Sequence, residues 1–319
     1  MRRLELLIKE VRRATENENA STTSGITDEE LANYFNDAQT RLQARITAQH
    51  PRMFLAQSLI SLVASTEVYG LPADIFLGSR IELLEWKFGS GTNDYEGIAH
   101  KALHERDTSY TSAGPYFYIR RDDDILINPV PSAALTDGLR LTYQKKLRDV
   151  DIRRGKIASA AKTGNVLDTI TLSDPTTLLN KDKELKTASD AVLQSIDYIC
   201  VVDKDGVSVL DQIPIDDYNK TTRVITVSAS FSTTVAAATF VGAYVVGGKV
   251  ATSHSDLKDV CERYLVSYVT FKVLRRDSNI QESEFQRDEL IALESDIINA
   301  YQVPEEDPLE LPLDNEWVQ

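Results

Sequence analysis

The chain of 319 residues has little of what several protein classes require. Its two cysteines, Cys200 and Cys261, are too few for a disulfide framework. It contains no apolar run of about 18 residues, so we expect no membrane span. Charged residues interrupt the apolar N-terminal stretch, which excludes a signal peptide. These absences favour a protein that folds in the cytoplasm.

Positive charge is also scarce. The chain has 35 Lys and Arg against 49 Asp and Glu, which gives a net charge of −14 at pH 7. A protein that grips nucleic acid needs a basic face, because it must neutralise phosphates. An excess of carboxylates instead repels a duplex, so DNA near this protein would not be held tightly. On composition alone, solubility is the simpler explanation of the charge.

Sequence motifs of catalysis are missing as well. There is no phosphate-binding glycine loop, dinucleotide fingerprint or nucleophile elbow. His100 and His104 are four residues apart, but Lys101 stands where a zinc protease needs Glu. The run Ser253–Asp256 contains triad residue types, yet adjacent residues cannot adopt the triad geometry. We therefore expect no enzyme, no cofactor and no metal site.

Two acidic runs have simpler interpretations than cation binding. Asp122–Asp124 is expected at a hairpin tip, where Asp is a common turn former. Asp203–Gly206 lacks the closing Glu of a calcium loop and is typical of a hairpin turn. Both cysteines are expected to be buried.

Helical periodicity occurs at both ends of the chain. Leu4–Val11 has the i, i+3, i+4, i+7 pattern of a helix. Thr27 and Glu30 form a capping box before a second helix, which Pro51 closes. The segments 257–271 and 285–301 carry two further apolar stripes. A short helix is also expected over 95–106.

Strand patterns occupy the middle of the chain. Residues 58–69, 79–88 and 139–145 favour strands, and 116–127 favours a hairpin. Residues 154–250 are rich in Ser, Thr, Val, Ala and Asp and lack long helical patterns. Several short strands at regular spacing predict a small β-sandwich or barrel inserted there.

These patterns together predict an α+β protein. We expect an antiparallel helical bundle core with β-hairpin elements and an inserted all-β domain. The expected division is a core of N-terminal helices and β elements over 1–153, an inserted β-sandwich-like domain over 154–250, and C-terminal helices over 251–302 that complete the bundle.

Residues 303–319 are expected to form an extended arm. Three prolines exclude a helix there, and acidic residues surround an alternating apolar pattern. Such an alternating apolar pattern is uncommon in a segment that stays unfolded. The expected partner-binding residues are Leu309, Leu311, Leu313 and Trp317.

Five segments in this order carry a resemblance to a known family. They are the capped helix Thr27–Ala38, Glu67–Ile75 with its Tyr-Gly-Leu-Pro-Ala-Asp sequence, Pro115–Ile119, Ile125–Pro131 and Leu139–Leu147. With a C-terminal helical pair after them, the chain resembles the head-to-tail adaptor (connector) proteins of tailed bacteriophages. The resemblance covers about residues 1–150 and 255–302, and 154–250 departs from it.

The resemblance implies a non-enzymatic virion protein at the head–tail junction, assembled in the host cytoplasm. Its family forms rings, usually of twelve copies, that dock on the portal protein and connect it to a tail nozzle or tail-tube protein. The ring surrounds the channel through which DNA passes during genome ejection. The C-terminal arm is then expected to contact the portal, as an added strand.

Other functions remain open at this point. The chain could be a tail-completion or tail-tube protein, which ring symmetry would distinguish from an adaptor. The segment 154–250 could bind a tail fibre, another tail protein or a glycan through Tyr198, Tyr218 and Tyr244, although a core role is the simpler one for each. An enzyme with an unrecognised carboxylate site is the remaining alternative.

Overall fold

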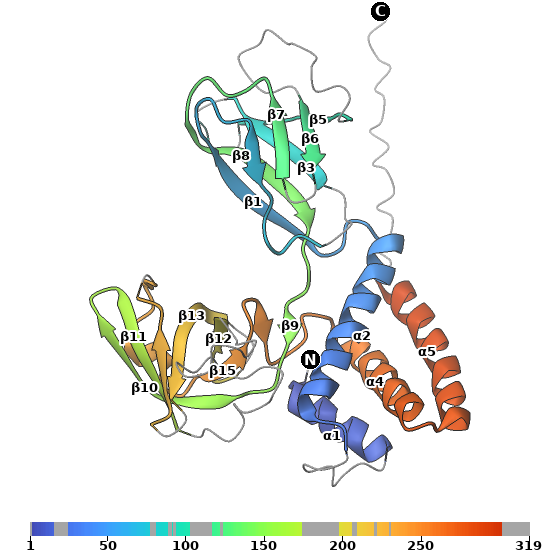
Figure 1. The fold of residues 1–319 in the computed structure, drawn as a ribbon. Helices are drawn as coiled ribbons and strands as arrows, with labels where there is room; N and C mark the ends of the chain where they lie inside the picture. Colours follow the sequence, from blue (N-terminus) through green and yellow to red (C-terminus); the bar gives the residue numbers. More distant parts are fainter. Residues whose placement is uncertain are drawn as a thin grey trace, which may run out of the picture.

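The structure is a computed structural model of the chain. The residues that it describes are 2–15, 25–76, 81–88, 91, 94–102, 117–121, 124–173, 198–205, 209–219, 222–229 and 231–301. Figure 1 shows three units that meet near the short strand β9 (Asp149–Val150): a helical unit and two β domains.

The two ends of the chain build the helical unit. Its helices are α1 (Leu4–Ala14), α2 (Asp28–Gln49), α4 (Glu262–Arg276) and α5 (Ile280–Ala300). Their apolar stripes share one buried core, so the N-terminal helices fold against the C-terminal pair. Among the described residues, no helix has the length and apolar composition needed to cross a bilayer.

The start of α2 follows the predicted capping pattern. The backbone N–H of Glu30 donates to Thr27 Oγ1 at 3.2 Å, and Ile26 is buried just before the cap. The start of α4 differs from expectation. The predicted apolar stripe begins at residue 257, but a 3₁₀ turn, Asp259–Cys261, comes first and the α-helix begins at Glu262.

The first β domain is a sandwich of two four-stranded sheets. One sheet has the order β1-β8-β3-β4 and the other β2-β7-β6-β5, and their inward residues share one core. The strands are β1 (Leu55–Leu62), β2 (Val68–Gly70), β3 (Ile81–Lys87), β4 (Tyr95–Gly97), β5 (Ala99–His100), β6 (Phe117–Arg121), β7 (Asp124–Asn128) and β8 (Leu135–Gln144).

The second β domain is a closed barrel with the order β10-β11-β14-β13-β12-β15. Closure leaves no open sheet edge, and Ile, Val and Leu alternate into its centre. Its elements are β10 (Gly155–Thr163), β11 (Val166–Leu172), β12 (Tyr198–Val202), β13 (Val209–Asn219), β14 (Val224–Val227), β15 (Tyr244–Gly247) and the short helix α3 (Ala237–Phe240).

The predicted helical bundle core is wrong as a description of this fold. The described chain is rich in β structure, with five α-helices and a closed six-stranded barrel. The strands of 55–144 are not hairpins attached to a bundle. Their alternating apolar residues face each other across two sheets and form a separate core.

Two of the predicted elements appear in the structure and one does not. The hairpin appears as β6 and β7, and the expected strand at 139–145 matches the second half of β8, which ends at Gln144. The helix expected over 95–106 is wrong for the residues described there, which form β4 and β5. The N–H of Ile98 donates to Leu84 O at 2.8 Å, so pairing with β3 overrides the local pattern.

Alkaline pH should weaken the helical core through Tyr264. Burial raises the pKa of Tyr264 to about 12, whereas an unfolded tyrosine ionises near about 10. The stabilisation is therefore complete below about pH 10 and is lost as the pH rises toward about 12, because the unfolded chain ionises first. In urea unfolding, the free energy of unfolding should decrease less between pH 8 and pH 10.5 for Tyr264→Phe than for the parent chain. Equal decreases would contradict this role of Tyr264.

Candidate functional site

The three units are joined through the segment 145–154, which runs from the sandwich past α2 into the barrel (Figure 1). Its strand β9 pairs in parallel with β16 (Ala251–Thr252), on the return path from the barrel to α4. The chain's entry into the barrel and its exit from the barrel therefore pass side by side. We call the residues 145–154 and 247–257, with the α2 side chains that contact them, the junction.

Side-chain amides of α2 bind the backbone of the junction. Asn36 exchanges two hydrogen bonds with Val150, at 2.7 and 3.0 Å. Gln43 Nε2 donates to Lys145 O at 2.7 Å, and its Oε1 accepts from the N–H of Leu147 at 3.2 Å. These residues share one helix face because they are seven apart. The α2 side chains thus satisfy the backbone hydrogen-bonding groups of an extended segment, as a neighbouring strand would.

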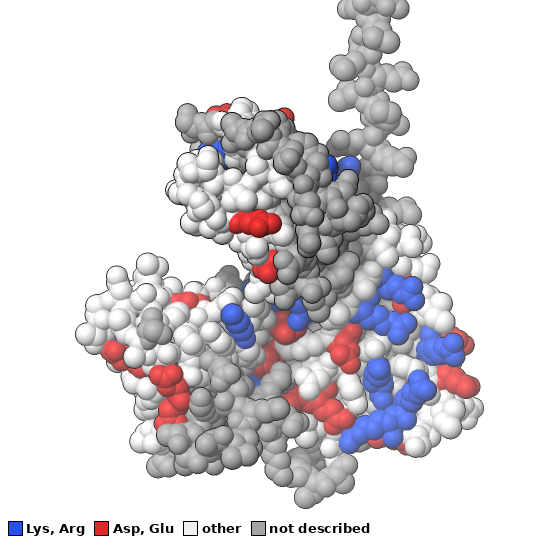
Figure 2. Space-filling model, turned by 45° about the horizontal axis from the view of Figure 1, so that its top comes forward, with Lys and Arg blue, Asp and Glu red and all other residues white. Residues whose placement is uncertain are grey.

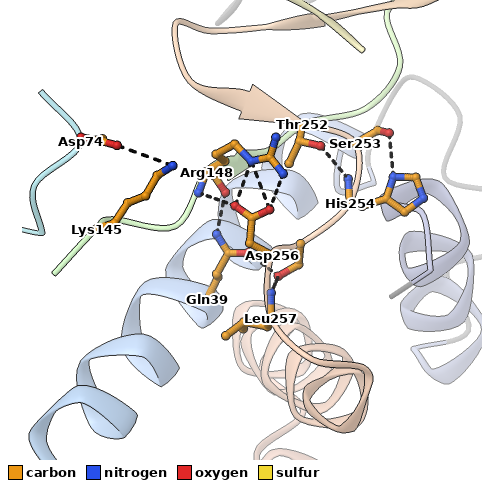
Figure 3. Close-up of polar contacts among 10 residues, drawn as sticks. Gln39, Asp74, Lys145, Arg148, Thr252, Ser253, His254, Asp256 and Leu257 are labelled. Atoms are coloured by element: carbon orange, nitrogen blue, oxygen red, sulfur yellow. Dashed lines mark hydrogen bonds and ion pairs between the residues drawn. The ribbon is translucent and has the colours of Figure 1, made fainter. Parts of the chain in front are cut away.

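Gln39 lies between them on the same face and connects both strands of the junction. Its Nε2 donates to Arg148 O at 2.8 Å, and its Oε1 accepts from Ser255 Oγ at 2.5 Å. Figure 3 shows Gln39 close to Arg148 and Asp256, which form a bidentate ion pair. Arg148 Nη2 and Nε lie 2.5 and 2.9 Å from the carboxylate oxygens of Asp256. A fork-to-carboxylate pair fixes orientation as well as distance.

A second ion pair is completely enclosed where the segment enters the barrel. Arg154, with 0% of its surface exposed, donates to Asp151 through Nε at 2.6 Å and Nη2 at 3.0 Å. Asp151 also accepts from the N–H of Gly247 in β15 at 2.7 Å. Glu29, in the first turn of α2, lies 3.8 Å from Arg154 Nη1. The buried Arg154 guanidinium therefore contacts Asp151 of the segment 145–154 and lies near Glu29 of α2, and Asp151 in turn binds the barrel.

The sandwich is attached at the other end of the segment. Tyr143 donates to Asp74 Oδ1 at 2.7 Å, and Lys145 Nζ lies 3.6 Å from Asp74 Oδ2 (the latter pair is drawn in Figure 3). Burial and this hydrogen bond raise the pKa of Tyr143 above its usual range. Asp74 and Tyr143 belong to two of the segments that carried the family resemblance, so the fold brings these segments together.

The polar side chains of the junction attach the domains to one another. Ser253 Oγ lies 3.0 Å from His254 Nδ1, the nearest approach to a catalytic pair, but Asp256 binds Arg148 instead of orienting the imidazole (Figure 3). Among the described residues there is no group of three or more His, Cys, Asp or Glu that suits a metal ion. What this arrangement can do is hold three domains in fixed relation.

The other predicted candidates are dispersed. His100 lies in β5, and Asp124 begins β7; their companions His104, Asp122 and Asp123 lie outside the described residues. Leu309, Leu311, Leu313 and Trp317 lie outside them as well. Cys200 and Cys261 are buried as predicted, and burial raises the pKa of both thiols.

The three barrel tyrosines have different surroundings. Tyr218 is in the barrel core. Tyr244 lies under the guanidinium of Arg153, 4.1 Å from the ring centroid, and Tyr198 has Lys249 Nζ at 5.2 Å. Tyr198 and Tyr244 therefore contact cations near the junction.

A second surface of interest lies on the helical unit. A groove of about 960 Å³ runs between α2, α4 and α5. Figure 2 shows basic side chains gathered over the helices, although the chain as a whole is acidic. The charged residues that line the groove are Arg41, Arg45, Lys272, Arg275 and Arg287, with Glu284 and Glu294.

Sequence reasoning missed both the amide contacts and the groove. The signal for the first was present: Asn36, Gln39 and Gln43 recur at i, i+3 and i+7 beside the apolar stripe of α2. The groove combines residues from three helices, and only the tertiary arrangement brings them together.

These features define a class of protein, a multidomain scaffold with a rigid polar junction and a basic groove. Residues 2–159, about half of the chain, match the family model described as SU10 adaptor protein, and through this part the chain belongs to that family. The resemblance to phage head-to-tail adaptors is thereby confirmed for this span. Among curated proteins the comparison finds no match.

The matched span covers α1, α2, the sandwich and the junction segment 145–154. It ends inside β10, so nearly all of the barrel and the pair α4 and α5 lie beyond it. The family consists of structural phage proteins, which makes this chain a virion component that contacts other phage structural proteins.

Removing one member of the buried pair should be severely destabilising. Asp151→Asn leaves the Arg154 guanidinium enclosed without its nearest carboxylate, and we expect a loss of about 3–5 kcal/mol in the free energy of unfolding. Asp151→Asn with Arg154→Met should recover part of that loss, because the enclosed guanidinium is removed together with the carboxylate that paired with it. Lys146→Ala removes an exposed pair with Asp149 and should cost about 1 kcal/mol or less. Urea unfolding measures all three, and equal effects of Asp151→Asn and Lys146→Ala would contradict the assignment.

Gln43→Leu should separate the amide contact from helix packing. Leucine keeps the side-chain volume but leaves Lys145 O and the N–H of Leu147 without their partner, at a cost of about 1–3 kcal/mol. Gln49→Leu is the matched control on the exposed part of the same helix. If thermal unfolding shows the same midpoint for both variants, the amides do not hold the junction.

Proposed function

We propose that this chain is a structural subunit of the ring that connects the portal of a tailed phage to its tail. The observation that carries the proposal is the family match over residues 2–159, which includes α1, α2, the sandwich and the junction segment 145–154. A ring subunit must hold its contact surfaces in constant relation, and the junction supplies that rigidity through enclosed, hydrogen-bonded polar groups.

The partners in this proposal are other copies of the chain, twelve in the usual ring, the portal protein and a tail nozzle or tail-tube protein. The net charge of −14 suits a channel through which DNA slides without being held, because like charges repel. The location is the head–tail junction of the virion, after assembly in the host cytoplasm. The ring is present when the genome leaves the capsid.

We propose that the chain has the domain boundaries expected from its sequence: 1–153, 154–250, 251–302 and the arm 303–319. The barrel falls almost entirely outside the matched family span. We assign it contacts that differ between phages, such as those with a tail fibre. Tyr198 and Tyr244 are less buried than Tyr218 and are its first candidates for contact.

Electron microscopy of the purified chain, alone and mixed with its portal protein, tests the proposal. A ring of twelve subunits that stacks on the portal is the expected result. A six-fold ring that stacks into tubes would instead indicate a tail component, and a monomer in both preparations would contradict the adaptor function.

The arm is proposed to contact the portal through Leu309, Leu311, Leu313 and Trp317. Deletion of 304–319 should leave the chain folded, as judged by circular dichroism, and weaken portal binding at least about tenfold, since about 1.4 kcal/mol of lost contact gives that factor. Co-sedimentation with the portal measures the binding. Replacement of these four residues by Ser is the matched control, because it removes the apolar side chains and keeps the length of the arm. Unchanged binding of both variants would exclude the arm as a portal contact.

A further inference from the structure

The basic groove has more positive charge than its own residues balance. Of its five cations, Arg45 pairs with Glu294 at 3.0 Å. Within the described part of the chain, no ion pair is recorded for Arg41, Lys272, Arg275 or Arg287. Five cations against the two carboxylates Glu284 and Glu294 leave an excess of three positive charges in one concave surface, on a chain with a net charge of −14, and this excess favours an acidic occupant.

The groove is also apolar along one side. Ile280 and Ile291 of α5 line it with 68% and 60% of their surfaces exposed. Tyr268 and Phe271 of α4 face it from the other side. Tyr268 lies beneath two of the cations, with Lys272 Nζ at 5.4 Å and Arg41 Cζ at 5.8 Å from its ring centroid. An occupant that satisfies this surface must carry both carboxylates and large apolar side chains.

We propose that residues 303–319 of the same chain occupy this groove in the free subunit. Their sequence has the required composition: six Asp and Glu, no Lys or Arg, and the apolar Leu309, Leu311, Leu313 and Trp317. Its carboxylates match the cations of α2, α4 and α5, and its leucines match the exposed isoleucines of α5. Prolines at 304, 308 and 312 keep the segment extended, as a groove requires.

The position and length of the segment agree with this assignment. Ile298 and Asn299 line one end of the groove, and α5 ends at Ala300, directly beside the point where the segment begins. The 21 residues of α5 span about 32 Å, and residues 303–319 reach about 55 Å when fully extended. The segment can therefore turn back and follow α5 along the whole groove.

Covalent attachment favours the chain's own segment over that of a second copy. A tethered segment has a local concentration in the millimolar range, which exceeds the concentration of free subunits. The leucines and Trp317 that fill the groove are those proposed to contact the portal, so portal docking would have to displace them. This contact would keep the arm from binding unassembled subunits prematurely.

Fluorescence of Trp317 in the full chain provides the test. The chain has two tryptophans, so Trp86→Phe leaves Trp317 as the reporter. At low salt, acrylamide should quench Trp317 about threefold less efficiently than it quenches a free peptide of residues 303–319, because the tethered segment remains bound. Quenching as efficient as in the peptide would overturn the proposal.

Charge reversal identifies the surface. Lys272→Glu, Arg275→Glu and Arg287→Glu together should raise quenching to the peptide value. Glu305→Lys, Glu306→Lys and Asp307→Lys should do the same, and the two sets combined should restore protection. Lys9→Glu, Lys156→Glu and Lys204→Glu reverse three exposed cations elsewhere and should change nothing. Equal effects of the groove set and this control set would contradict the assignment, provided that circular dichroism shows all variants folded.

Dilution distinguishes the source of the segment. Protection that is constant over a hundredfold dilution, about the range that separates tethered from free partners, supports the same chain. Protection that disappears on dilution assigns the groove to the arm of a second copy and overturns the proposal. The portal is absent from these measurements, so their failure leaves the adaptor function standing, and the failure of portal binding leaves the groove contact standing.

Discussion

The arrangement of all three domains depends on how one helix holds one extended segment. Residues 145–154 leave the sandwich, cross α2 and enter the barrel, and their backbone needs hydrogen-bond partners along the whole path. Asn36, Gln39 and Gln43 supply those partners from the helix. The enclosed pair Asp151–Arg154 then fixes the entry to the barrel through the N–H of Gly247. A buried charge is costly unless it is paired, so this arrangement tolerates little displacement.

This constraint explains how the barrel, which lies almost entirely beyond the matched span 2–159, is held against the rest of the chain. The barrel enters and leaves through β9 and β16, which pair with each other and are held by Arg148–Asp256. The helical core is closed by α4 and α5 after the barrel, so the insertion interrupts the sequence of the helical unit but not its packing. The surfaces of the sandwich, helices and barrel thus keep a fixed relation within one subunit, as the proposed ring requires.

The sequence was most informative where a local pattern agrees with tertiary packing. The N-cap Thr27, the apolar stripes of the helices and the hairpin near Asp124 could be predicted directly. Phe285 shows the limit, because it continues the last stripe yet is 73% exposed. Residues 95–97 form a strand through pairing with β3 and residues 99–100 through pairing with β6, and the two sheets of 55–144 have a core of their own. Such pairings join residues far apart in sequence, and so does the junction, whose bonds link Gln43 to Lys145 and Asp151 to Gly247. Periodicity does not reveal them.

Labelling of intact virions with an antibody to the barrel, residues 155–247, tests the central claim that this chain joins head and tail. The account predicts label at one capsid vertex, at the level where the tail begins. Label along the whole tail, or on the capsid away from that vertex, would contradict it.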